Sequence, residues 1–147
     1  RYDIGSSQLV LPSYVSLVGA GEKITVISSN LCYSPPVVEA TLVGSTGGEI
    51  RDVTVENTCA DDTRFGVAIW LPPGAADARL ARVTGRVTGH AEVNFGVHVG
   101  SDRSALERVN GVATGGDRAA SPCTFPAAPP CCWTARGTPR GRRGTMP

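Results

Sequence analysis

The chain has 147 residues, which is enough for one domain. Of these residues, 41% are hydrophobic and only 5% are aromatic. A net charge of +1 at pH 7 gives no electrostatic reason to expect nucleic acid as a partner. The sequence lacks a run of about 18 apolar residues, so we expect no membrane span.

The first 30 residues read as short alternating runs broken by glycine, namely Leu9–Pro12, Tyr14–Gly21 and Lys23–Ile27. Such runs are typical of short strands with tight corners and not of helix. Three later stretches, each holding two or three short strands, have the same character: Val37–Asn57, Phe65–Val87 and Phe95–Val112.

Parts of these stretches copy one another at nearly constant spacing. The matching units are Phe65–Ile69 with Phe95–Val99, Ile50–Thr54 with Leu80–Thr84 and Leu106–Asn110, and Leu17–Gly19 with Leu42–Gly44. Self-similarity at 25 to 30 residues, with strand-like alternation inside each unit, predicts a stacked β-solenoid of about four coils. The fold class is therefore all-β.

In-register stacking of these units predicts which residues face inward. We expect Phe65, Val67 and Ile69 inside, stacked on Phe95, Val97 and Val99. Two further apolar ladders are expected, Ile50 with Leu80 and Leu106, and Val53 with Val83 and Val109. The same register pairs outward opposite charges, namely Glu49 with Arg79, Asp52 with Arg82 and Glu56 with Arg86.

The five cysteines do not form a regular set. Cys32 and Cys59, 27 residues apart, fall in neighbouring coils, and either a disulfide or two buried thiols is consistent with the sequence. The odd count and irregular spacing favour two thiols. Cys123, Cys131 and Cys132 lack a fourth ligand at zinc-site spacing.

The repeat pattern stops after Asp117, which divides the chain into a solenoid domain, residues 1–117, and a tail, residues 118–147. The tail contains five arginines, no acidic residue, and many prolines, and it reads as irregular. An Arg-Gly tail can bind nucleic acid, but plain irregular structure is the favoured interpretation.

The region from Leu11 to Asp117 resembles right-handed parallel β-helix proteins of the pectin-lyase-like superfamily. The resemblance rests on Leu11–Gly21, on the following Gly21–Ile27, and on Glu49–Thr58. It implies three short parallel sheets per coil and an extracellular or cell-surface, often carbohydrate-related, setting. Members include pectate lyases, polysaccharide hydrolases and surface proteins without known catalysis. Because complete members stack more coils, we expect a truncated member; no signal peptide is visible.

The enzymes of this superfamily use clustered carboxylates, for Ca²⁺ or for acid–base chemistry. Asp61 and Asp62 form the sole adjacent acidic pair and are weak metal candidates, since aspartate is also common in turns. We assign no catalytic residue, no metal site and no cofactor.

Trp70 and His98 should point outward on one sheet, one coil apart, where the indole would offer a sugar-stacking platform. The alternative, which is the favoured interpretation, is that Pro72 and Pro73 fold back over Trp70 and that His98 is a solvated surface residue.

The sequence thus predicts a non-catalytic surface or structural module that binds glycan or another protein on an exposed sheet face. The alternative is a fragment of a polysaccharide lyase or hydrolase. Open solenoid ends also predict end-to-end self-association.

Overall fold

The computed structural model describes residues 1–34, 36–61, 63–89, 91–115, 118–119 and 124–125. These residues form strands and no helix, in the order β1 (Tyr2–Asp3), β2 (Leu9–Val10), β3 (Leu17–Val18), β4 (Val26–Ser29), β5 (Leu42–Val43), β6 (Glu49–Asn57), β7 (Phe65–Leu71), β8 (Arg79–Val87), β9 (Val93–Val99), β10 (Ala105–Ala113), β11 (Arg118–Ala119) and β12 (Thr124–Phe125). The named strands pair in parallel, apart from β10 with β12. The chain is therefore a parallel β-solenoid of about four turns, as predicted.

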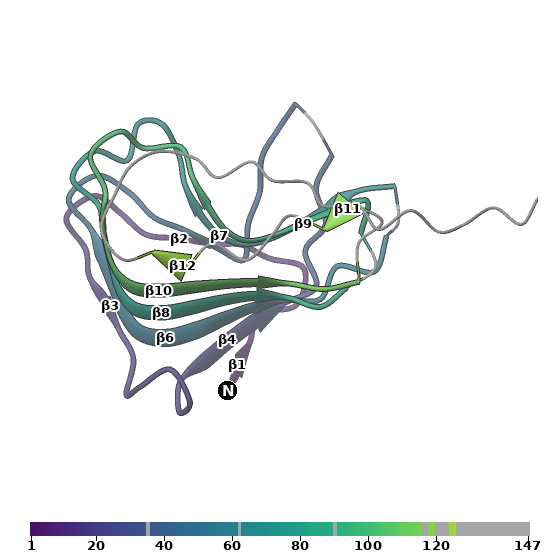
Figure 1. The fold of residues 1–147 in the computed structure, drawn as a ribbon, viewed down its shortest axis with the longest axis horizontal. Helices are drawn as coiled ribbons and strands as arrows, with labels where there is room; N and C mark the ends of the chain where they lie inside the picture. The colour runs from purple at the N-terminus through teal and green to yellow at the C-terminus, as the bar shows by residue number, and fades with distance from the viewer. Residues whose placement is uncertain (35, 62, 90, 116–117, 120–123, 126–147) are drawn as a thin grey trace, which may run out of the picture.

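Two sheets face each other across the solenoid (Figure 1). One has the order β1-β4-β6-β8-β10-β12, with β3 also paired to β6, and the other has the order β11-β9-β7-β5-β2. In the first sheet, β3 pairs with the beginning of β6 and β4 with its end. Between these halves of β6, Asp52 has a φ of 57°, and Arg82 and Arg108 repeat this conformation in β8 and β10. Each long strand bends there, so a coil has three straight segments.

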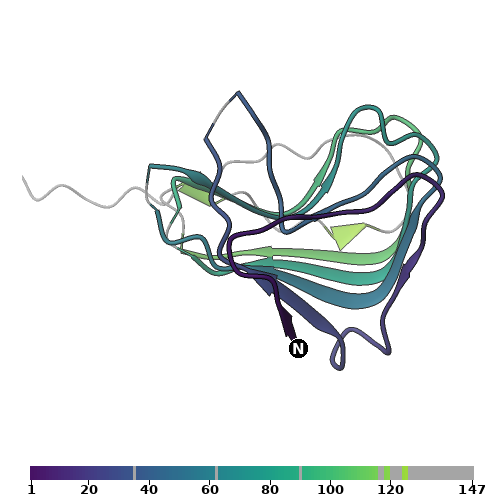
Figure 2. The same cartoon turned by 180° about the vertical axis from the view of Figure 1, so that it is seen from behind.

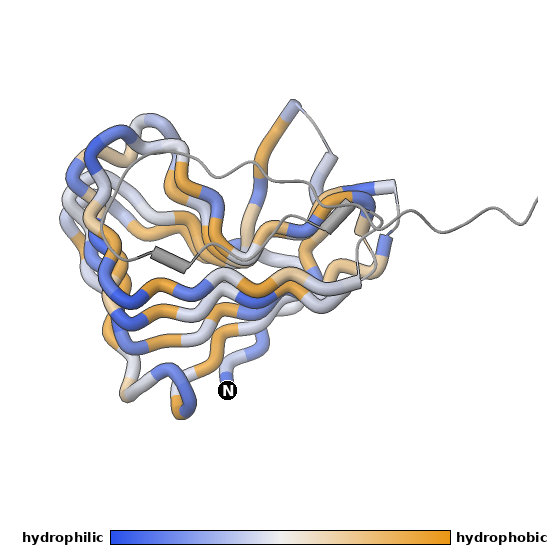
Figure 3. Tube along the Cα trace, viewed as in Figure 1, coloured by the Kyte–Doolittle hydropathy of each residue, from blue (hydrophilic) through white to orange (hydrophobic). Residues whose placement is uncertain are grey.

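The main core fills the space between the sheets. Its buried side chains include Leu42, Ile50, Ile69, Leu71, Leu80 and Val83. Both expected apolar ladders of the first sheet are confirmed, because Ile50 pairs with Leu80 and Leu80 with Leu106, and Val53, Val83 and Val109 pair in the same way. Hydrophobic segments recur at matching places on the stacked strands (Figure 3). Repeated burial of one face is what holds adjacent coils together.

The predicted register of the second sheet was wrong by two residues. Phe65 pairs with Val93 and Val67 with Phe95, so Phe65 does not stack on Phe95. The connections differ in length from coil to coil, and the offset of 30 residues that holds between β6 and β8 becomes 28 between β7 and β9. The repeated units Leu17–Gly19 and Leu42–Gly44 do not stack on each other, since Leu17 pairs with Ile50 and Leu42 with Ile69.

Three side chains of β7 were predicted to point into the main core, and this was right for one of them and wrong for two. Ile69 packs in the main core, but Val67 and Phe65 belong to a separate apolar cluster. Ala68 also packs in the main core, so two successive side chains point inward and the strict alternation is interrupted.

Two short strands, β11 and β12, lie in the segment predicted to be irregular and pair with β9 and β10. Cys123, Cys131, Cys132, Trp133 and the Arg-Gly run lie outside the described residues. The described part of the chain contains no apolar helix of membrane-spanning length.

Candidate functional site

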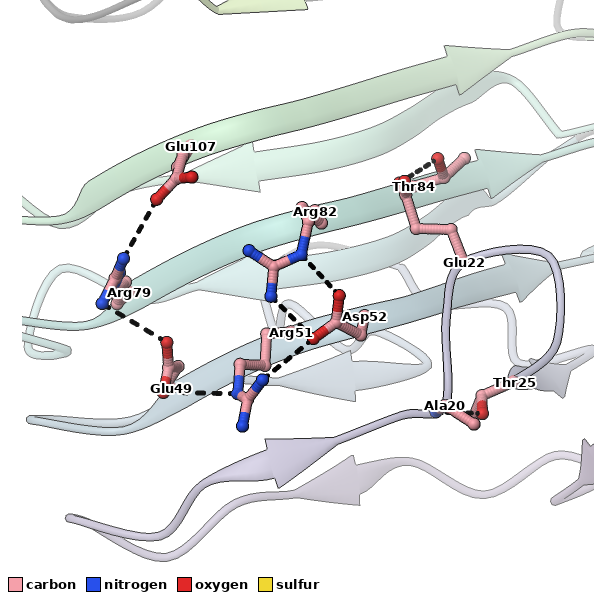
Figure 4. A network of polar contacts seen from close by, with 10 residues as sticks. All are labelled: Ala20, Glu22, Thr25, Glu49, Arg51, Asp52, Arg79, Arg82, Thr84 and Glu107. Carbon is pink, nitrogen blue, oxygen red and sulfur yellow. Dashed lines mark hydrogen bonds and ion pairs between the residues drawn. The ribbon is translucent and has the colours of Figure 1, made fainter.

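The three predicted charge pairs on the first sheet are confirmed. Glu49 lies 3.5 Å from Arg79, and Glu56 lies 3.1 Å from Arg86. Arg82 binds Asp52 side-on, with Nε 2.6 Å from Oδ1 and Nη2 2.8 Å from Oδ2. Figure 4 shows that the pairs of Glu49 and Asp52 join into one network of alternating charge, which runs through Glu107, Arg79, Glu49, Arg51, Asp52 and Arg82.

The network keeps the carboxylate of Asp52 ionised. The hydrogen bond from Arg82 is the largest influence on Asp52 and lowers the pKa of that carboxyl below its usual 3.8. A carboxyl group held ionised and bound on both oxygens is unsuited to donate a proton at neutral pH. Asp52 therefore has a structural part in this network and is not suited to act as a general acid.

The weak metal candidate Asp61 lies in a turn. Its Oδ1 accepts hydrogen bonds from the backbone N–H and the hydroxyl of Thr63, at 3.0 and 2.7 Å, and its Oδ2 lies 3.1 Å from Arg64 Nε. The two bonds from Thr63 are the main reason why the pKa of Asp61 is lowered. Asp62 lies outside the described residues. Among those that are described, no three His, Cys, Asp or Glu side chains gather closely enough to hold a metal ion.

The preference for two thiols at Cys32 and Cys59 was wrong, because these residues form a disulfide with Cα atoms 5.1 Å apart. Cys32 lies in the loop between β4 and β5, and Cys59 follows the end of β6. Next to the disulfide, Tyr33 and Phe65 exchange backbone hydrogen bonds of 3.1 and 2.9 Å. This antiparallel bridge holds the loop against the sheet and brings the two cysteines together. The odd cysteine count was misleading because the three remaining cysteines all fall in the tail.

The loop of residues 30–41 covers a second apolar cluster, which we call the outer cluster. Tyr33, Ala40, Val43 and Val67 are buried in it, and Val38, Phe65, Trp70 and Phe95 are partly buried against it. In Figures 1 and 2 the loop stands on the side of the β5-β7-β9 sheet that faces away from the other sheet. The outer cluster is thus separate from the main core and lies on the outside of the solenoid.

Trp70 and His98 are register partners on β7 and β9, so the structure brings the two predicted residues together. Neighbouring residues in parallel register point to the same side of a sheet. Both side chains are half-buried, and the imidazole of His98 stacks on Phe95 with ring centroids 5.2 Å apart. Pro73, which the alternative interpretation places over Trp70, lies against Gly100.

His98 is uncharged on this surface. Burial lowers the pKa of its imidazole below the usual 6.5, and its buried Nδ1 has no hydrogen-bond partner among the described residues. The face formed by Trp70, Phe95 and His98 is therefore aromatic and neutral at physiological pH.

The sequence interpretation missed Tyr33, Phe65 and Phe95 as parts of this face. The rings of Tyr33 and Phe65 pack in a tilted arrangement with centroids 5.3 Å apart. The one available signal was the pair of cysteines, since a disulfide between Cys32 and Cys59 would have placed the residue after Cys32 beside β7.

Comparison with known proteins finds no matching family model, no matching curated protein and no matching solved structure.

Proposed function

We propose that this chain is a non-catalytic surface module that binds carbohydrate on the outside of the β5-β7-β9 sheet. Trp70 is the stacking platform, and His98 and Phe95 extend it. The proposal includes an extracellular or cell-surface location and kinship with the pectin-lyase-like superfamily, which the parallel solenoid supports.

One observation carries the proposal: the chain has few aromatic residues, and half of them lie together in the outer cluster. The protein has two tryptophans, three tyrosines and three phenylalanines, and four of these eight residues form the outer cluster. Phe65, Trp70 and Phe95 each keep an exposed portion. Flat apolar rings at a surface suit the C–H faces of sugar rings, which bury apolar area without needing a charged partner.

The electrostatics favour a neutral glycan. His98 carries no charge at physiological pH, and Arg79, Arg82 and Arg86 are paired with carboxylates on the other sheet. The disulfide between Cys32 and Cys59 supports the proposed location, because disulfides persist mainly in oxidising compartments.

Affinity electrophoresis in gels that contain neutral or acidic polysaccharides tests the proposal. We expect a neutral polysaccharide to retard the protein and Trp70→Ala to abolish the retardation. Tyr14→Ala is the matched control, since Tyr14 is an aromatic residue 79% exposed but far along the chain from this face. Absence of retardation in every gel, or equal retardation of the Trp70 variant, would refute the glycan-binding proposal and leave a protein ligand for this face.

The enzyme alternative makes an opposite prediction. A fragment of a polysaccharide lyase or hydrolase would release unsaturated products or reducing ends from such substrates. Turnover that is lost on changing Asp61 or Asp62 would overturn the non-catalytic proposal.

A further inference from the structure

His98 carries a polar atom that the fold does not satisfy. Its Nδ1 is buried, and no described residue offers it a hydrogen bond. An unpartnered buried nitrogen costs free energy, whereas an apolar side chain of similar shape would occupy the same place without that cost. Nδ1 of His98 therefore does not stabilise the sheet, and the presence of a polar ring at this position calls for another explanation.

The second ring nitrogen, Nε2, is open to solvent. Unlike Nδ1 it is not enclosed by protein atoms, and no described residue forms a hydrogen bond with it. A neutral imidazole has one donor nitrogen and one acceptor nitrogen. Because Nδ1 is enclosed, Nε2 is the atom through which His98 can bind a ligand.

The imidazole is held in one orientation. It stacks on the ring of Phe95 with centroids 5.2 Å apart and an angle of 22° between the planes, and Phe95 packs against the outer cluster. Two residues after His98, the N–H of Gly100 donates to the carbonyl of Leu71 at 2.7 Å, which fixes the end of β9 against the end of β7. A polar atom on a rigid support is what a selective binding site requires.

Trp70 is the register partner of His98 on the neighbouring strand β7 (Figure 1). Adjacent strands lie about 4.8 Å apart, so the two side chains are close neighbours on the outer face. A sugar that stacks its C–H face on the indole projects its hydroxyl groups from the edge of its ring. Nε2 of His98 is therefore placed to bind a hydroxyl of a sugar that Trp70 holds.

This hydrogen bond would be a neutral one. The imidazole is uncharged at physiological pH, because burial lowers its pKa. A neutral donor or acceptor distinguishes ligands by the position of a hydroxyl group and not by their charge. Binding sites of this kind combine an apolar lining with a few polar groups that fix the orientation of the ligand.

We propose that His98 is the specificity-determining residue of the carbohydrate site. Trp70 supplies stacking that any neutral pyranose can use, and Nε2 of His98 binds one hydroxyl group and so selects among sugars that differ at that carbon. This inference rests on the proposed function and goes beyond it, because it assigns stacking and selection to two different residues.

Competition in affinity electrophoresis tests the inference, in a gel that contains the neutral polysaccharide that retards the protein. The competitors are the monosaccharide of that polysaccharide and its derivatives that each lack one hydroxyl group. We expect one deoxy sugar to compete about fivefold more weakly than the complete sugar, the factor that corresponds to one typical net hydrogen bond. His98→Phe keeps a flat ring beside Trp70 but removes both nitrogens, so it should still be retarded and should lose this difference.

His98→Gln is the matched variant, since its amide keeps a hydrogen-bond donor and an acceptor, and it should retain part of the difference. Circular dichroism shows whether the variants are folded, and His98→Leu replaces His98→Phe if the latter is not. If no gel retards the parent, the proposed function itself fails. If the parent is retarded but shows no difference among the competitors, or if His98→Phe shows the same difference as the parent, His98 does not determine specificity and the binding proposal stands alone.

Discussion

Arg82 binds the carboxylate of Asp52 on the coil below it, and both residues occupy the left-handed region of backbone conformation, with φ values of 52° and 57°. This conformation costs an ordinary L-residue about 1–2 kcal/mol. The side-on pair of hydrogen bonds offsets part of that cost. Arg108 takes the same conformation one coil further on, with a φ of 52°, but it has no ion pair with any described residue.

Arg108→Gly should therefore stabilise the protein by about 1 kcal/mol, because glycine adopts positive φ without a steric penalty. Urea denaturation monitored by circular dichroism measures the change. Ala105→Gly is the matched control in the same strand, at an exposed position without positive φ, and it should cost about 0.5–1 kcal/mol. If both substitutions destabilise equally, the backbone of Arg108 is not strained.

Replacing Cys32 and Cys59 together by serine should lower the free energy of unfolding by about 3–4 kcal/mol. The disulfide closes a loop of 27 residues, which restricts the unfolded chain, and it anchors the segment that covers the outer cluster. Urea denaturation of this variant and of the parent gives the difference. When reductant is added, the free energy of unfolding of the parent should fall toward that of the variant, whose own value should not change. An unchanged value for the parent would contradict the prediction.

Gly66→Ala should destabilise the solenoid by about 1–3 kcal/mol, the usual cost of overpacking a core. A Cβ at this position would lie 2.8 Å from Asn94 Oδ1 and 3.1 Å from Asn57 Oδ1. Neither amide can move easily, because the Asn94 Nδ2 donates to Gly89 and Thr114 and the Asn57 Nδ2 donates to Leu31.

Gly74→Ala provides the control for this substitution, measured by thermal unfolding of both variants. Apart from its chain neighbours, no atom of the described residues lies within 4 Å of a Cβ at Gly74, so the midpoint of thermal unfolding of Gly74→Ala should stay close to that of the parent. Equal midpoints for the two alanine variants would show that the space around Gly66 can adapt.

His98 should make the protein less stable as the pH falls. Burial lowers its pKa in the folded state below the unfolded value of 6.5, so the unfolded chain binds the proton more readily in the interval between the two values. Stability should be full above pH 6.5 and decline as the pH drops through that interval.

Urea denaturation at about pH 7.5 and about pH 5.5 measures this change. His98→Gln should reduce the loss between the two conditions. The same loss in parent and His98→Gln would assign the effect to other groups.

The sequence predicted the first sheet well for a definite reason. Glu49, Asp52 and Glu56 meet Arg79, Arg82 and Arg86 at the same spacing that aligns Ile50 with Leu80. Two independent patterns, one apolar and one charged, agree on one register, so a shift by any number of residues would break both.

The second sheet had no such check. The motif Phe-Gly-Val occurs at Phe65 and at Phe95, and its identity suggested a stack that the connecting loops do not allow. The length of the connecting loops decides which residues pair, and sequence identity between two strands carries no information about loop length. The pairing of Trp70 with His98 could be expected as neighbours one coil apart, but Phe95 and Tyr33 became part of the same face through the actual register and the loop of residues 30–41.

The amino-acid sequence by itself determined that this chain winds as a parallel β-solenoid, because alternation and recurrence specify local strands and their stacking. The tertiary structure alone decided the disulfide and the outer cluster. Both features depend on where the loop of residues 30–41 returns to the sheet, and the spacing of like residues does not specify that.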